Sequence, residues 1–136
     1  MKNVIEYEIN YRKYKINEPN LDFENGYAIF YDEIILDIND GLGNVYTDLV
    51  YVKGVVDTDL NIVINPQYNY DYIEILDDKS ILVCESYNTV EKGYMEHFRY
   101  LYRKYDDRFV MVNCDLDMAN KLLMFKYKEK EYNRGR

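Results

Sequence analysis

Tryptophan is absent from this chain, and its 136 residues include only one histidine, two cysteines and two prolines. Because His97 is alone, the HExxH zinc motif and a general-base histidine elsewhere are both excluded, and the phosphate-binding pattern GxxxxGK is missing too. The spacing of Cys84 and Cys114 is typical of neither a zinc site nor a redox site, so we expect two reduced, buried thiols. A catalytic pair of His97 with either thiol would depend on the fold, and no local pattern supports one.

Long hydrophobic runs are also missing. No stretch approaches the roughly 18 apolar residues that a membrane-spanning helix needs. The N-terminal sequence, MKNVIEYEIN, lacks the apolar segment of a secretory signal. We therefore expect a cytoplasmic protein, in its own cell or in an infected host cell, with no membrane partner.

Basic residues are nearly missing from the middle of the chain. Residues 18–90 carry fifteen Asp or Glu against only Lys53 and Lys79, and the whole chain has a net charge of −8. Because non-specific binding to DNA or RNA needs clustered Lys and Arg, the sequence argues against a direct nucleic-acid partner. The segments 1–17 and 91–136 are mildly basic, so we expect a dipolar molecule with an acidic sheet side.

Tyrosine is abundant, with 17 residues, many of them in or beside the acidic segment. An AT-rich genome favours Tyr, Asn, Ile, Lys and Asp through its codons, which is one explanation of this count. The same bias favours Lys, which is scarce in residues 18–90, so it explains the charge distribution less well.

The length and the apolar fraction of 48% are those of one globular domain. We expect a single domain over residues 1–136, with 130–136 as a frayed polar tail. The first two thirds of the chain predict strands, and Gly54 is expected to form a bulge. The segments concerned are an alternating run from Ile5 to Tyr11, β-rich runs at 27–38 and 45–56, a short strand at 60–64, and a hairpin of 72–76 with 81–87 around the turn 77–80.

Two helices are predicted in the C-terminal third. Asn88 and Glu91 resemble a capping box, and apolar residues follow at helical spacing from Val90 to Tyr105. For residues 94–105 a strand is the alternative, because apolar and polar side chains also alternate there, but we favour the helix.

The end of the chain predicts one more strand and one more helix. Residues 109–114, FVMVNC, predict a buried strand, and Asp115 or Asp117 is placed to cap a final helix. Short connections between consecutive strands favour antiparallel pairing. The fold class is therefore α+β, with a mostly antiparallel sheet of about six or seven strands and two C-terminal helices.

The sequence predicts no cofactor and no strong metal site. Residues 37–44, DINDGLGN, resemble a calcium-binding loop, but the glycine is out of register, so a hairpin turn is the better interpretation. Asp57, Asp59 and Asn61 would share one side of an extended segment and are weak candidates for a hard cation. Paired carboxylates would suit a hydrolase, but with 25 acidic residues such pairs also arise by chance.

The segment YNYDYIEILDD favours an interaction surface instead. Tyrosine supplies large, stiff contacts at interfaces, and carboxylates around it select a basic partner. In a regular strand, Tyr68, Tyr70, Tyr72 and Glu74 would share one face. The residues expected to bind the partner are Tyr68, Tyr70, Asp71, Tyr72, Glu74, Asp77 and Asp78.

These observations favour a small acidic protein-binding module without catalytic activity. It would act as an inhibitor or an immunity-type protein, and in the sharpest version it would imitate nucleic acid and occlude a basic site on a nuclease or a defence protein. The alternatives are a carboxylate- or metal-dependent hydrolase, and a viral structural or accessory protein. The partner's identity and the oligomeric state do not follow from the sequence.

Overall fold

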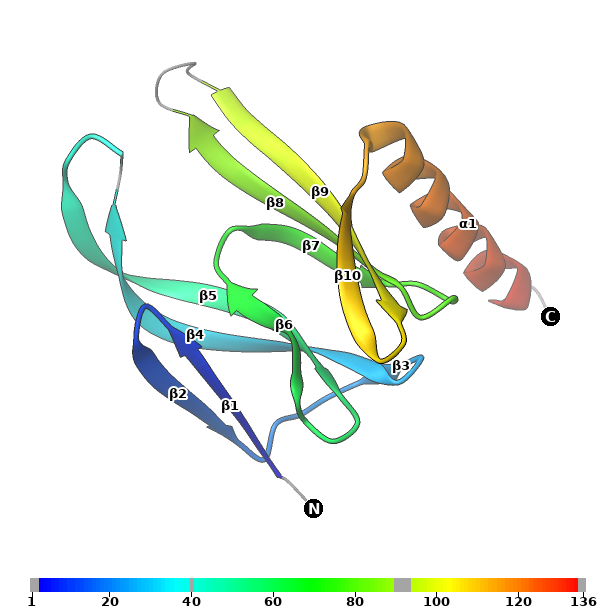
Figure 1. Ribbon diagram of the computed structural model, residues 1–136, viewed down its shortest axis with the longest axis horizontal. Coiled ribbons are helices and arrows are strands. Elements are labelled where there is room, and N and C mark those ends of the chain that lie inside the picture. Colours follow the sequence, from blue (N-terminus) through cyan, green and yellow to red (C-terminus); the bar gives the residue numbers. More distant parts are fainter. Residues whose placement is uncertain (1–2, 40, 90–93, 135–136) are drawn as a thin grey trace.

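The computed structural model describes residues 3–39, 41–89 and 94–134. Within these residues the chain forms ten strands in three antiparallel sheets and one C-terminal helix (Figure 1). The α+β class is confirmed, but the expected sheet of six or seven strands with two helices is wrong in its counts. The strands are β1 (Val4–Ile9), β2 (Arg12–Asn17), β3 (Phe23–Glu24), β4 (Tyr27–Asn39), β5 (Val45–Asp57), β6 (Ile62–Gln67), β7 (Tyr70–Ile75), β8 (Ile81–Thr89), β9 (Tyr94–Tyr105) and β10 (Arg108–Asn113), and the helix is α1 (Leu116–Arg134).

The first sheet has the order β3-β4-β5-β6 and is covered on one face by the β1–β2 hairpin. Alternation places Ile5, Tyr7 and Ile9 on the inner side of β1, where they pack against Phe30 of β4 and Val52 of β5. The Tyr7 hydroxyl also donates a hydrogen bond of 2.5 Å to Asp32 Oδ2. Burial, and then the neighbouring Asp32 carboxylate, raise the pKa of this phenol.

The second sheet has the order β10-β9-β8-β7 and packs on the other face of the first. Its inner face carries Tyr70, Ile73 and Val83, which meet Val55 and Ile64 of the first sheet in a buried cluster. The apolar residues of β8 lie on both faces of that strand, because one face meets the first sheet and the other meets α1.

Helix α1 covers part of the outer face of the second sheet. Asp115 caps it as predicted: its Oδ1 accepts a hydrogen bond of 2.7 Å from the Met118 N–H. Ala119 of the helix packs with Leu82 and Leu101 of the sheet. The chain thus stacks a hairpin, two sheets and a helix in sequence, as Figure 1 shows.

The helix that we favoured for residues 94–105 is wrong, because the segment is strand β9. It lies between β8 and β10, pairing with β8 over residues 94–102 and with β10 over residues 100–105. These ladders bind the backbone groups of β9, and the alternating pattern places Leu101 against α1 and Tyr102 against the inner core. Of the expected capping box, Asn88 lies in β8, and Glu91 falls outside the described residues.

Other strand predictions are confirmed or corrected. The hairpin around residues 77–80 is present. The bulge predicted at Gly54 is wrong, because two steps from Lys53 to Val55 correspond to three steps from Gln67 to Ile64, so the extra residue lies in β6, opposite Gly54.

Tyr11 does not extend the first strand. It forms a two-residue turn with Asn10, in which both residues have positive φ. The strand predicted at 109–114 is present as β10, but the expectation that it is buried is wrong: β10 is the edge of its sheet and is mostly exposed.

Candidate functional site

A bulge in β7 rearranges the predicted interaction surface. Tyr70 pairs with Glu85 and Tyr72 pairs with Cys84, so two steps along β7 correspond to one step along β8, and Asp71 is the extra residue. The expectation that Tyr70 and Tyr72 share a face is therefore wrong. Tyr70 points into the core between the sheets, whereas Tyr72 packs against the cluster beneath α1.

Several of the residues expected to bind a partner have internal roles. Tyr70 is buried, and its hydroxyl donates to the Asn65 carbonyl at 3.1 Å. The Glu74 carboxylate pairs with Lys126 of α1 at 3.0 Å. Asp78 accepts hydrogen bonds from the backbone and the hydroxyl of Ser80, which order the β7–β8 turn. The exposed members of the predicted set are Tyr68, Asp71, Asp77 and Asp78.

The weak metal candidates lie at the turn after β5. The Asp57 carboxylate accepts backbone hydrogen bonds from Asp59 at 2.9 Å and from Asn61 at 3.0 Å, so it holds its own turn. Asp59 and Asn61 line a surface hollow of about 780 Å³ that Glu18 also borders. The turn by itself accounts for the position of Asp57.

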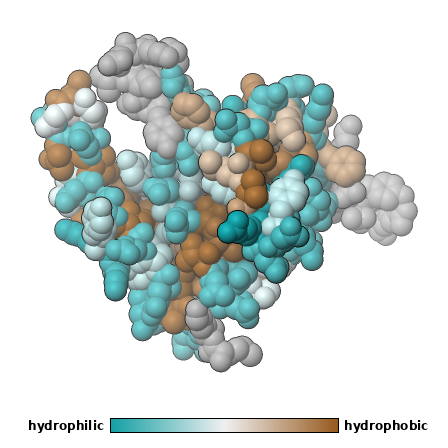
Figure 2. Space-filling view, in the orientation of Figure 1, coloured by the Kyte–Doolittle hydropathy of each residue, from teal (hydrophilic) through white to brown (hydrophobic). Residues whose placement is uncertain are grey.

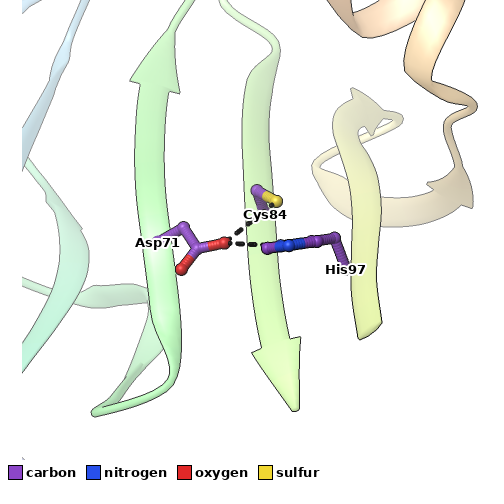
Figure 3. A group of neighbouring side chains, drawn as sticks. All are labelled: Asp71, Cys84 and His97. Atoms are coloured by element: carbon purple, nitrogen blue, oxygen red, sulfur yellow. Dashed lines mark hydrogen bonds and ion pairs between the residues drawn. The ribbon is translucent and has the colours of Figure 1, made fainter. Parts of the chain in front are cut away.

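A compact polar cluster lies on the outer face of the second sheet and unites Asp71, Cys84 and His97 (Figure 3) with Ser86. Asp71 Oδ2 lies 3.0 Å from His97 Nδ1 and 3.6 Å from Cys84 Sγ. The Ser86 hydroxyl donates to the same carboxylate oxygen and lies 2.7 Å from His97 Nδ1. The four side chains come from the three neighbouring strands β7, β8 and β9.

Strand geometry explains why these residues meet. Ser86 is the pairing partner of His97, and Cys84 lies two residues before Ser86 on the same face of β8. The bulge then turns Asp71 onto this face, beside Cys84. The Cys84 side chain is 1% exposed, while His97 and Asp71 are 45% and 40% exposed, so the cluster has a buried floor and an open rim.

The hydrogen bonds set the charge of the cluster. Burial raises the pKa of Asp71, but the hydrogen bonds that it accepts, first from Ser86 and then from His97, outweigh this, so its pKa lies below the usual value. Burial also raises the pKa of the Cys84 thiol, and the nearby Arg99 cation opposes that rise. The cluster therefore presents an ionised carboxylate, a protonated thiol and an imidazole around one point.

The arrangement is not that of a serine-hydrolase triad. In such a triad the nucleophile and the carboxylate contact opposite nitrogens of the imidazole. Here Ser86 and Asp71 both lie at His97 Nδ1, so His97 cannot relay a proton between them. The donor atoms converge on one carboxylate oxygen, which is a geometry for holding a shared cation or proton.

Sequence reasoning named Asp71, Cys84 and His97 but did not bring them together. The intervals from Asp71 to Cys84 and from Cys84 to His97 match no local motif, since they span two hairpin turns. The available signal was the alternation in residues 94–105. As a strand, this segment places His97 beside Ser86, whereas the helix that we favoured separates them.

Lys126 forms a second buried polar site under α1. Its side chain is 3% exposed, and its Nζ lies 3.0 Å from Glu74 Oε2 and 3.2 Å from Glu24 Oε1. It also donates to the Ile75 carbonyl at 2.5 Å. Burial lowers the pKa of this ammonium, but the two carboxylates outweigh the effect and raise it above the usual value. The ion pairs join α1 to β3 and β7.

The outer part of the β4–β5 hairpin, residues 31–51, carries the most exposed apolar face of the first sheet, and we call it the arm. The β1–β2 hairpin covers one side of the arm, with Ile34 and Leu36 buried there. We call the opposite side the arm face. Apart from the region where the second sheet packs, no element of the described part of the chain covers it. It presents Tyr31, Glu33, Ile35, Asp37, Val45, Leu49 and Tyr51.

The arm face combines aromatic, aliphatic and acidic side chains. Tyr51 is 72% exposed and lies opposite Glu33, while Ile35 lies opposite Leu49. Figure 2 shows hydrophobic and hydrophilic side chains side by side at this end of the molecule. The base nearest to the arm face, Lys53, donates from its ammonium to the Asp71 carbonyl at 3.0 Å and so is held on the second sheet.

No protein-family model matches the sequence, and no curated protein or solved structure matches the chain. No helix in the described part of the chain combines the length and the apolar character needed to cross a bilayer. The site geometry is therefore the basis for a functional argument.

Proposed function

We propose that this chain is a small acidic protein-binding module that docks a basic partner protein on the arm face and blocks the partner's working surface. The observation that carries the proposal is the bare arm face. A row of large apolar side chains stays exposed there, although the sequence could have alternated polar residues outward, as a solvated sheet face normally does.

The composition of the arm face fits an interface. Tyr31 and Tyr51 are 66% and 72% exposed, and each supplies a large contact area at a small cost in side-chain entropy. Ile35 and Leu49 lie between them and the hairpin end and extend the apolar strip. An exposed strip of this kind is typical of a surface that another protein covers.

The charge on the arm selects the partner. Between Lys15 and Lys53 the sequence contains no basic residue, and Glu33 and Asp37 lie on the arm face itself. Carboxylates around an apolar strip speed the approach of a cationic surface and repel an acidic one. The occupant that fits is therefore a protein with apolar side chains inside a basic rim.

A nucleic-acid-binding protein is the basic partner that we favour. Carboxylates held along β4, namely Glu33 and Asp37, would occupy a channel that normally receives phosphates. Inhibition would then be steric and electrostatic, with no bond made or broken by this chain. An immunity-type protein or an inhibitor of a nuclease acts in this way.

The test compares three forms of the chain as affinity baits in extract from the source organism. They are the wild type, a double variant of the arm face (L49S with Y51S), and a control (Y105S) that removes an exposed tyrosine from β9. We expect a basic protein to be captured by the wild type and Y105S, and its affinity for the arm variant to fall by at least about tenfold, since two central apolar contacts are lost.

The chain and its captured partner, once purified, then test the electrostatic mechanism. The association rate should fall by about tenfold or more between low and high salt, because a 1 M salt solution shortens the Debye length to about 3 Å. Capture that is equal for the wild type and the arm variant would contradict the proposal, and so would an acidic partner. If DNA fails to compete with the chain for the partner, the nucleic-acid mimic is wrong while the binding module stands.

A further inference from the structure

The cluster of Asp71, Cys84 and His97 contains the donor set of a metal site. Asp71 Oδ2, Cys84 Sγ and His97 Nδ1 all lie within 4.8 Å of one another, and in the described residues they are the one group of His, Cys, Asp and Glu side chains that meets this condition. Three donor hydrogens, from Cys84, Ser86 and His97, point at one carboxylate oxygen. A single cation could replace the donors that surround this oxygen.

We propose that Asp71, Cys84 and His97 bind one Zn²⁺ ion on the outer face of the second sheet. The site is separate from the arm face and does not rest on the proposed function. Thiolate sulfur and imidazole nitrogen are ligands that Zn²⁺ prefers, whereas Ca²⁺ and Mg²⁺ take oxygen ligands. With Cys84 and Asp71 ionised and His97 neutral, the protein charges balance the ion.

The distances suit a tetrahedral ion. Zn–S and Zn–O bonds of about 2.3 and 2.1 Å at a tetrahedral angle place sulfur and oxygen about 3.6 Å apart. The observed separation of Cys84 Sγ and Asp71 Oδ2 is 3.6 Å. The same geometry requires about 3.4 Å between oxygen and imidazole nitrogen, against 3.0 Å between Asp71 and His97. It requires about 3.6 Å between Cys84 Sγ and His97 Nδ1, which lie within 4.8 Å of each other. Binding therefore needs side-chain rotations that adjust His97 toward Cys84.

The fold pre-forms the site. Cys84 sits on a central strand that is paired on both sides, and the bulge fixes Asp71 beside it. Cys84 is buried, whereas Asp71 and His97 reach solvent, so an ion enters from the open rim. The fourth position faces Ser86 and the solvent, as in zinc sites that keep one position for water.

Arg99 pairs with Cys84 across β8 and β9, so its guanidinium lies on the same face of the sheet as the thiol. Its positive charge offsets part of the negative charge that the Cys84 and Asp71 ligands would bring to the site.

The experiment titrates the reduced full chain with Zn²⁺ and with Co²⁺ as a spectroscopic probe. We expect one ion per chain, a sulfur-to-cobalt charge-transfer band that zinc removes, and a shift of the one imidazole signal in the NMR spectrum, since His97 is the only histidine. Two variants, C84S and H97Q, each remove a ligand. Loss of an outer partner already costs roughly 10–100-fold in metal affinity, so each variant should lose at least that much.

Cys114 provides the matched control. It is the second buried cysteine and it lies next to the N-terminus of α1, outside the cluster. C114S should keep the affinity and the charge-transfer band. The circular dichroism spectrum of each variant checks that it is folded, and the histidine signal of C84S reports the site even if the variant is less stable. Absence of zinc binding to the folded wild type, binding that survives in C84S and H97Q, or loss in C114S would each overturn the proposal.

Discussion

Lys126 is a buried charge whose role is structural. It lies against two carboxylates and a carbonyl, and the three contacts connect α1 to β3 and β7. Removing one member of a buried charge network leaves the others without compensation, which costs more than the network itself contributes. The Glu24 and Glu74 side chains are partly exposed, so solvent will screen part of that loss.

We predict that Lys126→Met destabilises the protein by about 1–3 kcal/mol in urea unfolding at pH 7. The raised pKa of Lys126 means that its contribution is complete below the ordinary lysine pKa and is lost only as the pH rises through the higher folded-state value. The difference from wild type should therefore stay constant between neutral pH and about pH 10. Lys121→Met is the control: Lys121 is exposed and pairs with an exposed Asp117, so its loss should cost under about 0.5 kcal/mol. Equal effects of the two variants would contradict the prediction.

Strand β5 depends on Gly54, which lies opposite the bulge of β6. A Cβ at this position would lie 2.7 Å from the Ile64 carbonyl oxygen and 2.9 Å from the Phe30 ring. Both neighbours are held in the core, so neither can withdraw without disturbing the packing of β6 or of the β1–β2 hairpin.

We predict that Gly54→Ala destabilises the protein by about 1–3 kcal/mol, the usual cost of overpacking a core. Gly43→Ala is the control for backbone strain without overpacking. Gly43 has a φ of +89° and open space around its Cβ position. This substitution should cost about 1–2 kcal/mol through backbone strain alone, with no overpacking. Thermal unfolding followed by circular dichroism measures both, and a larger effect at Gly43 than at Gly54 would refute the packing argument.

The elements that sequence reasoning predicted well are those with local signals. The Asp115 cap and the turn at residues 77–80 both follow from residue types at fixed offsets. The bulge predicted at Gly54 lies instead on the neighbouring strand β6. Strand β9 was missed because helical and alternating patterns coexist in it, and the sheet neighbours decide between them. The bulge at Asp71 has no glycine to mark it, so neither the split of the tyrosines nor the polar cluster could be predicted.

At the scale of the whole molecule, one apolar cluster joins the two large sheets. Val55, Ile64, Ile73 and Val83 are buried in it, and each sheet contributes to it from its inner face. Neither sheet could expose this face to water without losing the burial that stabilises it.

We predict that both sheets unfold in one transition. Val55→Ala removes two methyl groups at the centre of the shared cluster and should cost about 2 kcal/mol. Hydrogen exchange measured residue by residue should show an equal loss of protection in β4 and in β8. A loss confined to the first sheet would show that the sheets are separate folding units.

The outer edges of the arm have no strand beside them in the described part of the chain. Strand β3 pairs with β4 only at Tyr27 and Ala28, and β6 pairs with β5 only from Lys53 onward. Such edges invite a second copy of the same chain to add itself and start a polymer. Two arms brought together would oppose their own carboxylates with no basic residue between Lys15 and Lys53 to relieve the repulsion. The acidity by which we propose that the arm selects a cationic partner would thus also oppose the addition of a second copy of the protein at these edges.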